Sequence, residues 1–162
     1  MRTETINIYK FGELEEKAQT AALSEFRFIN TSHDWWRPIY DDAKQIELEI
    51  EGFNLEHKNA IGGGFTGSAY ESIKLILEHH GKDCDTYKIA ESYKKRIDEM
   101  DESAEDYERT YEQTVQTFEF EIRNEYWRLL REEYIHLMSN ESVKETIEAN
   151  DYEFTADGRQ WK

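Results

Sequence analysis

The segment KIAESYKKRIDEMDESAEDYERTYEQTVQTFEFEIRNEYWRLL, residues 88–130, decides the fold class of this chain. Its apolar residues recur in steps of mostly three and four, the spacing that places side chains on one face of an α-helix. The wider stretch from 82 to 157 contains neither glycine nor proline, so nothing in it obliges a helix to stop. We therefore predict a mainly helical chain.

One helix cannot account for all of this segment. A helix of roughly 50 residues would be about 75 Å long at ~1.5 Å per residue, which is too long for a compact domain of this size. Asp101 and Ser103 are both favourable N-cap residues. We predict a break near residues 101–103, so that the acidic region 82–148 forms a helical hairpin. A projecting coiled coil is the alternative, but the heptads are irregular.

The rest of the chain adds further helices and a little β-structure. The opening TINIYKF, residues 5–11, alternates apolar and polar residues as a half-buried strand does. Residues 152–154, followed by Asp157-Gly158, are typical of a terminal strand and turn. Helical spacing predicts helices over about 12–29, from a cap at Thr31-Ser32 to Gly52, from a cap at Ser68 to Gly81, and after Ser139-Asn140. The predicted fold is a single α+β domain over 1–162, mostly helical, with a small antiparallel sheet formed by the chain ends and the Gly-rich segment 58–67.

Composition excludes several classes of function. The chain has 36 Asp and Glu against 20 Lys and Arg, a formal net charge of −16, which opposes direct binding to nucleic acid or to an anionic membrane. Aromatic residues make up 14%, too many for a disordered chain. The apolar runs are too short to span a membrane. Cys84 is the only cysteine, and the N-terminus lacks the apolar segment of a signal peptide, so we expect the reducing cytosol.

The strongest functional signal is acidic. If the helix after Ile97 is continuous, four carboxylates step by four, three and four residues and form one stripe, which three further acids flank and Arg109 opposes. If a helix instead starts at Asp101 or Ser103, the stripe loses its first member and keeps Glu105, Glu108 and Glu112. DNA phosphates present a comparable density of charge, so the stripe is a candidate surface for a Lys/Arg-rich partner. The alternative is a solvated face that only aids solubility. We also select Trp35 as a candidate interface anchor, because exposed Trp is enriched at binding hot spots. The candidate acids are Asp98, Asp101, Glu102, Glu105, Asp106, Glu108 and Glu112.

No catalytic motif stands out. Gly62 to Gly67 lacks the Lys and hydroxyl of a phosphate-binding loop, and an isolated Glu133-x-x-His136 lacks the second copy that a di-iron centre needs. The cluster of His79, His80 and Cys84 fits the end of a helix better than a zinc site. We predict no catalytic residues, no metal and no cofactor. A metal-dependent enzyme using His80, Cys84 or His136 is the third functional alternative.

Four segments together show a family resemblance. They are IYKFGELEEKAQTAALSEFR at 8–27, DWWRPIYDDAKQI at 34–46, GGGFTG at 62–67 and YEFTADGR at 152–159. In this order they resemble a family of small, acidic phage and prophage proteins, some of which are labelled antitoxins. The resemblance implies a phage product in a bacterial cytosol and brings no catalytic residues with it.

The resemblance and the charge together predict an inhibitor. We expect a protein that binds a basic host protein, such as a CRISPR nuclease complex or another nucleic-acid-handling defence system, through an acidic surface that mimics DNA. An antitoxin that neutralises a basic toxin is the second alternative. The sequence leaves open whether the protein is a homodimer.

Overall fold

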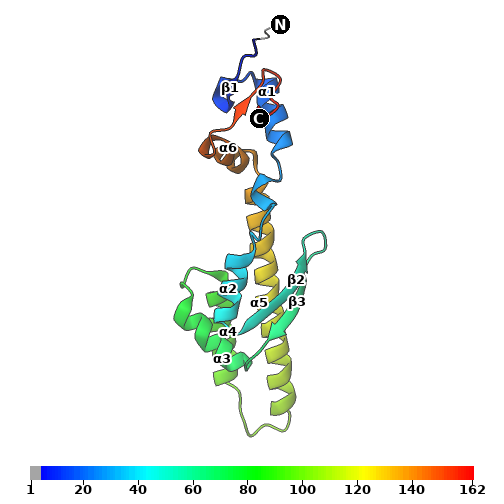
Figure 1. Ribbon diagram of the computed structural model, residues 1–162. Coiled ribbons are helices and arrows are strands. Elements are labelled where there is room, and N and C mark those ends of the chain that lie inside the picture. The colour runs from blue at the N-terminus through cyan, green and yellow to red at the C-terminus, as the bar shows by residue number, and fades with distance from the viewer. Residues whose placement is uncertain (1–4) are drawn as a thin grey trace. The chain divides into compact units, whose positions relative to one another are not determined.

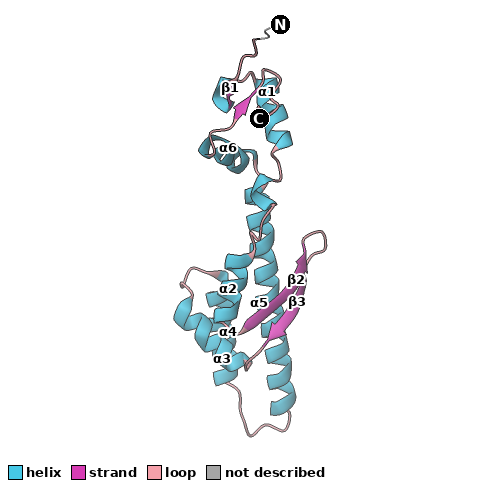
Figure 2. Ribbon diagram, in the orientation of Figure 1, coloured by secondary structure: helices cyan, strands magenta, loops and turns pink. Residues whose placement is uncertain are grey.

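The computed structural model describes residues 5–162. Residues 1–4, where the segment considered as a signal peptide begins, lie outside the described part of the chain. The predicted class, α+β and mostly helical, is confirmed (Figure 2). The helices are α1 (Glu16–Glu25), α2 (Arg37–Gln45), α3 (Ala69–His79), α4 (Asp85–Asp98), α5 (Tyr107–Leu137) and α6 (Asn140–Ala149), and the strands are β1 (Tyr9–Lys10), β2 (Leu48–Asn54), β3 (Ala60–Phe65) and β4 (Glu153–Phe154).

The chain divides into two compact units, where the sequence predicts one domain. Unit 1 consists of Met1–Trp35 and Glu132–Lys162, and unit 2 consists of Trp36–Arg131. The boundary falls within α5, so that this helix contributes residues to both units. Each unit has its own hydrophobic core, and the described members of each core come from that unit alone.

In unit 2, α2, α3 and α4 and the β2–β3 hairpin flank α5 (Figure 1). Phe118 of α5 is fully buried and lies at the centre of this arrangement. Its ring packs against Phe65 of β3 at 5.8 Å and against Tyr93 of α4 at 5.6 Å. The apolar face that the helical spacing predicts for α5 therefore closes the core of unit 2, with Ile122 and Tyr126 also fully buried.

The β2–β3 hairpin corrects the prediction of a helix as far as Gly52. The helix ends at Gln45, and Glu47 takes a left-handed conformation with φ of 62° that turns the chain into β2. The strand then buries Leu48 and Ile50 and exposes Glu49, the alternation of a half-buried strand. Its pairing with β3 contains a bulge between Ile50 and Gly52. The alternation covers only four residues, 48–51, and two of them are glutamate, which is a good helix former. The sequence therefore predicted a helix where the structure has a strand.

One helix boundary and one helix break in unit 2 are confirmed. Ser68 caps α3, its hydroxyl accepting a hydrogen bond from the Glu71 amide at 3.2 Å. The long helical region is interrupted between Asp98 and Tyr107, so the predicted break is confirmed; α5 begins only at Tyr107, however, and neither Asp101 nor Ser103 is its N-cap. The predicted cap of α2 at Thr31-Ser32 is wrong, because α2 begins at Arg37 with Pro38 in its first turn.

Unit 1 joins the two ends of the described chain. Strands β1 and β4 pair antiparallel, with Tyr9 opposite Phe154. Phe154 is fully buried and packs edge-on against Phe11 at 6.3 Å. The predicted strand at 5–11 is shorter than its alternation indicates, since Ile6 and Ile8 are exposed and precede β1. Within residues 5–162 the strands form two separate two-stranded sheets rather than the single predicted sheet.

A buried asparagine holds the helical part of unit 1 together. The Asn30 amide nitrogen donates to the Leu137 carbonyl at 3.1 Å and to the Ser142 hydroxyl at 3.0 Å. The Thr146 hydroxyl donates to the Asn30 amide oxygen at 2.7 Å. Because each polar group of this side chain has a partner, its burial specifies one arrangement of the last turn of α5 and of α6.

Candidate functional site

The predicted acidic residues gather where α4 passes into α5. Of the fifteen residues from 98 to 112, eight are acidic and only Arg109 is basic. Every one of those acidic side chains is exposed. We call the seven predicted acids of this stretch the acidic turn surface. They are Asp98, Asp101, Glu102, Glu105, Asp106, Glu108 and Glu112.

These residues do not form the predicted stripe along one helix. Asp98 is the last residue of α4, whereas α5 begins only at Tyr107. Of the four stepped acids, Glu108 and Glu112 alone keep their helical spacing on α5. Asp101 and Glu105 belong to the intervening turn, where cap-forming residues override the helical periodicity.

Hydrogen bonds fix part of the turn. The Ser103 amide and hydroxyl both donate to Asp101 Oδ1, at 2.9 and 2.6 Å, and lower the pKa of that carboxyl. The hydrogen bond from Lys94 likewise lowers the pKa of Asp98. Arg109 lies 3.5 Å from Asp106. These exposed contacts each contribute little to stability.

Three acids of the acidic turn surface have no basic side chain paired with them among the described residues. Among residues 5–162, no ion pair involves Glu102, Glu105 or Glu108. Their charges therefore face water and any approaching ligand.

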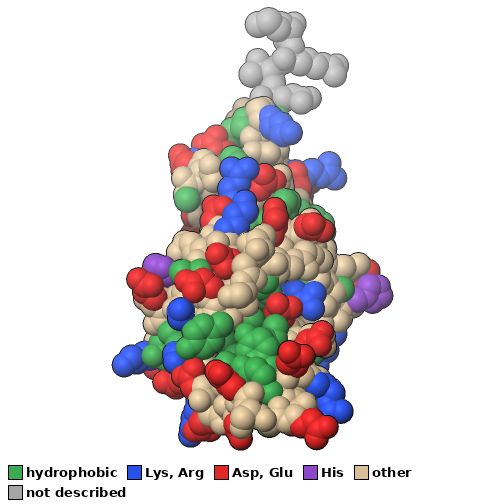
Figure 3. Space-filling model, turned by 90° about the horizontal axis from the view of Figure 1, so that it is seen from below, with side chains coloured by type: hydrophobic (Ala, Val, Ile, Leu, Met, Phe, Trp, Pro, Cys, Tyr) green, Lys and Arg blue, Asp and Glu red, His purple; other side chains and the backbone are tan. Residues whose placement is uncertain are grey.

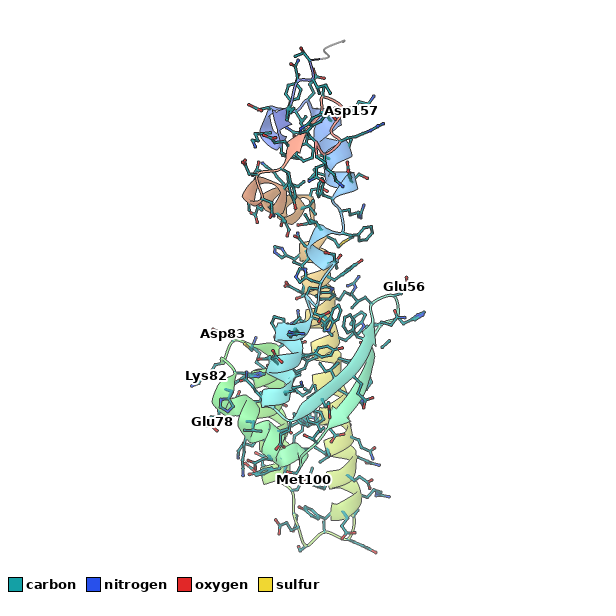
Figure 4. All side chains as sticks on the ribbon, in the orientation of Figure 1. Glu56, Glu78, Lys82, Asp83, Met100 and Asp157 are labelled. Atoms are coloured by element: carbon teal, nitrogen blue, oxygen red, sulfur yellow. The ribbon has the colours of Figure 1, made fainter. Side chains whose placement is uncertain are left out.

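Aromatic side chains accompany these charges. Tyr107 and Tyr111, on the first turns of α5, stack with their ring centroids 6.0 Å apart and are partly exposed. Viewed from the end of unit 2 where α4 passes into α5, hydrophobic side chains gather, and both acidic and basic side chains lie around them (Figure 3). Met100 marks the start of this turn in Figure 4. Tyrosine is enriched at protein interfaces, and their rims are polar.

Trp35 is not an exposed anchor. Only 9% of its surface is accessible, and its ring lies 5.7 Å from that of Tyr134 within unit 1. The neighbouring Trp36 is half-buried and packs edge-on against Phe53 in unit 2. Since both indoles have intramolecular partners, the prediction of an exposed Trp35 at an interface is wrong.

A second group of polar side chains lines a pocket in unit 2. The cluster of His79, His80 and Cys84 lies at the turn from α3 to α4, which Lys82 and Asp83 mark in Figure 4. As predicted, this is a helix end: α3 stops at His79 and His80 is its C-cap. The tertiary fold adds Asp42, Glu125 and Arg128 to the lining, and Tyr126 forms a hydrogen bond with Asp42; the sequence analysis selected none of these four residues.

These added residues form two hydrogen-bonded groups. The Tyr126 hydroxyl donates to Asp42 Oδ2 at 2.6 Å, and burial together with this bond raises the pKa of Tyr126. Arg128 donates to both carboxylate oxygens of Glu125 and to Asp85 at 3.1 Å. Glu125 and Arg128 lie three residues apart on a helix, a spacing at which opposite charges pair, so this ion pair could have been predicted from the sequence. Asp42 is distant in sequence, so only the fold reveals its role.

The pocket does not arrange His80 and Cys84 as the predicted metal-dependent enzyme would require. His80 turns one ring nitrogen towards Thr86 and the other towards Asp42, and no hydrogen bond joins it to the exposed Cys84. In the described part of the chain, no three His, Cys, Asp or Glu side chains are placed to hold a metal ion. His136 is exposed on α5, in unit 1.

Comparison of the chain with family models, with curated proteins and with solved structures gives no match. No helix among residues 5–162 combines the length and the apolar character required to cross a membrane.

Proposed function

We propose that this protein is a phage-encoded inhibitor, acting in the bacterial cytosol, that binds a basic host protein through the acidic turn surface. The partner is a nucleic-acid-handling defence protein, such as a CRISPR nuclease complex, and the surface occupies the groove that would otherwise hold nucleic acid. The density of exposed, uncompensated carboxylates between α4 and α5 is the observation on which this proposal rests.

Charge geometry supports mimicry of a phosphate backbone. Glu108 and Glu112 lie one helical turn apart, so their carboxylates can repeat at about 5–6 Å. DNA carries one phosphate per roughly 3.4 Å along each strand, and a Lys/Arg-rich groove matches that density of charge. The ordered Asp101 turn holds further carboxylates beside this helix. A folded surface of this kind pays less ordering entropy on binding than a disordered acidic tail.

The aromatic pair supports a protein partner. Among residues 5–162, neither the Tyr107 nor the Tyr111 hydroxyl has a hydrogen bond, so each can still donate to a partner. Tyrosine supplies buried area and a polar group at interfaces, so the pair supports a docking surface over a merely solvated acidic face.

The test is a pulldown from host lysate followed by affinity measurement with a charge-matched control. The test variant changes Asp101, Glu105, Glu108 and Glu112 to Lys. The control changes Glu25, Glu78, Glu91 and Glu145 to Lys, which alters the net charge by the same amount on exposed positions elsewhere. We expect the test variant to lose at least roughly tenfold in affinity, because its lysines place like charges against a basic partner, and the control to retain binding, because it leaves this surface intact.

Three results distinguish the alternatives. A salt-sensitive nuclease or another DNA-binding complex in the pulldown supports the inhibitor. A single small basic protein would instead identify an antitoxin. Equal binding by the test and control variants would remove the acidic turn surface from the mechanism. Circular dichroism of both variants checks that the fold survives.

A further inference from the structure

Strand β3 is an edge strand with one open side. Among residues 5–162, β2 is its only hydrogen-bonded neighbour, so no strand lies along its other side. The Thr66 amide donates to the Glu47 carbonyl at 2.8 Å. Because consecutive amides of a strand point in opposite directions, the Phe65 amide points away from β2, and it has no hydrogen bond to any other element of the described chain. Such an edge is a template for a further strand.

The usual protection of an edge strand is missing from β3. Natural edge strands often carry a charged residue or a proline that opposes pairing with another chain. The six residues of β3, AIGGGF, include neither. Gly62 and Gly64 are exposed, and because glycine consists of backbone alone, the backbone of β3 itself is open to solvent.

The same two glycines are not required by the hairpin. Gly64 has no atom within 4 Å of the place where a Cβ would stand, and Gly62 meets only the Gly52 carbonyl oxygen, at an ordinary 3.7 Å. Neither has a positive φ, in contrast to Gly63. Glycine inside a strand lowers stability and often marks a position that another backbone approaches closely. Since residues 62 and 64 are two apart, they leave one face of β3 bare.

A carboxylate lies across this bare face. Glu49 of β2 is opposite Gly64 in the register and therefore shares its face of the sheet. Its side chain is exposed, and no Lys or Arg of the described residues forms an ion pair with it. A strand added beside β3 would lie two strand spacings from β2, roughly 9.5 Å. A Lys or Arg opposite Gly64 can extend over that glycine towards Glu49, because no side chain stands between them.

We propose that the open edge of β3 binds an extended segment of a partner protein that carries Lys or Arg at every second residue. The segment pairs with β3 through its backbone, and its basic side chains lie over Gly62 and Gly64 towards Glu49. A second copy of this chain fits less well, because pairing β3 with β3 would bring together two chains of net charge −16. None of these residues belongs to the acidic turn surface, so the proposal does not rest on the proposed function.

Nuclear magnetic resonance of the ¹⁵N-labelled full chain, titrated with end-capped peptides, tests the site. With the peptide VRVRVRV we expect saturable shifts of the β3 amides and new protection of the Phe65 amide from exchange. The peptide VVRRRVV has the same composition without the alternation, and VQVQVQV has the alternation without the charge. Each should bind at least roughly threefold more weakly, the size of an exposed ion pair.

Two isomers of VRVRVRV test the backbone pairing. One is N-methylated at every Arg and the other at every Val, so that each lacks the amide donors along one edge. We expect one isomer to lose at least roughly tenfold in affinity and the other to retain binding, because only one edge of an added strand faces β3.

Matched variants test the charge. Glu49→Gln should weaken binding of VRVRVRV roughly threefold and leave VQVQVQV unaffected, whereas Glu91→Gln, which removes an exposed charge on α4, should change neither. No saturable shift, equal binding of VRVRVRV and VVRRRVV, equal behaviour of the two N-methylated isomers, or equal effects of the two variants would each overturn the proposal. A free chain that dimerises with its Phe65 amide already protected would assign the edge to a second copy and would also overturn it.

Discussion

At the scale of single residues, the Gly-rich segment allows two backbones to approach closely, which is a use that consecutive glycines permit. Gly63 has a φ of +108°, and a Cβ added there would lie 1.9 Å from the Glu49 carbonyl oxygen. Gly64, the next residue, has open space around the corresponding position. The run of glycines thus contains one position that requires glycine and one that does not.

These neighbours make a matched test. Gly63→Ala should lower the free energy of unfolding by about 2 kcal/mol or more, because the backbone of β2 and β3 must separate. Gly64→Ala should change it by at most about 0.5 kcal/mol, since a methyl group there meets nothing. Urea unfolding of both variants, followed by circular dichroism, measures the difference. Equal stabilities would show that the hairpin tolerates a side chain at Gly63.

At the scale of elements, the turn between α4 and α5 depends on the ionised form of Asp101. Hydrogen bonds from Ser103 favour the carboxylate and lower its pKa below the ordinary 3.8. A lowered pKa in the folded state means that this contribution is fully present above the unfolded pKa. It is lost as the pH falls through the folded pKa, below 3.8.

Amide exchange measures this dependence. We expect the Ser103 amide to be protected at pH 5–6 and to lose protection on acidification below about pH 3.8, as Asp101 takes up a proton. Asp101→Asn, which keeps the acceptor oxygen and cannot titrate, should retain protection throughout this range. Asp101→Ala should lack it at every pH. A pH response in Asp101→Asn equal to that of the natural chain would assign the effect to another group.

At the scale of the whole molecule, net charge is the dominant property. A net −16 on 162 residues repels itself in the folded state more than in the expanded unfolded state. Salt screens this repulsion over a Debye length of about 10 Å at 0.1 M. The surface ion pairs, such as Lys94 with Asp98, are weakened by the same screening but are individually weak.

Stability should therefore rise with salt. We expect the Tm at pH 7 to increase when NaCl is raised from about 20 to 200 mM. Screening the repulsion between like charges should stabilise the folded state more than screening the ion pairs destabilises it. Near pH 4.7, where the sequence predicts zero net charge, the increase should disappear. Differential scanning calorimetry at the two pH values tests this sign. A Tm that falls with salt at pH 7 would show that specific ion pairs dominate over net repulsion.

Much of the fold follows from local sequence. The apolar spacing of 107–130 requires a helix with one buried face, and Ser68 and Ser139 cap the helices that follow them. The interruption near Asp101 follows from helix length and cap residues in the same way. These features depend on residues within a few positions of each other, so the sequence determined them without knowledge of the fold.

Tertiary structure decided the pairing of the strands, the burial of Trp35 and the composition of the pocket. Leu48 and Phe65 pair across a hairpin, and Asp42 meets His80 from a separate helix. The acidic character of the α4–α5 turn was evident from composition, but its shape was not, because Ser103 and Asp101 end the helical periodicity there. Contacts between residues distant in sequence depend on how several elements pack at once, and a periodicity read along one segment contains no information about its partner.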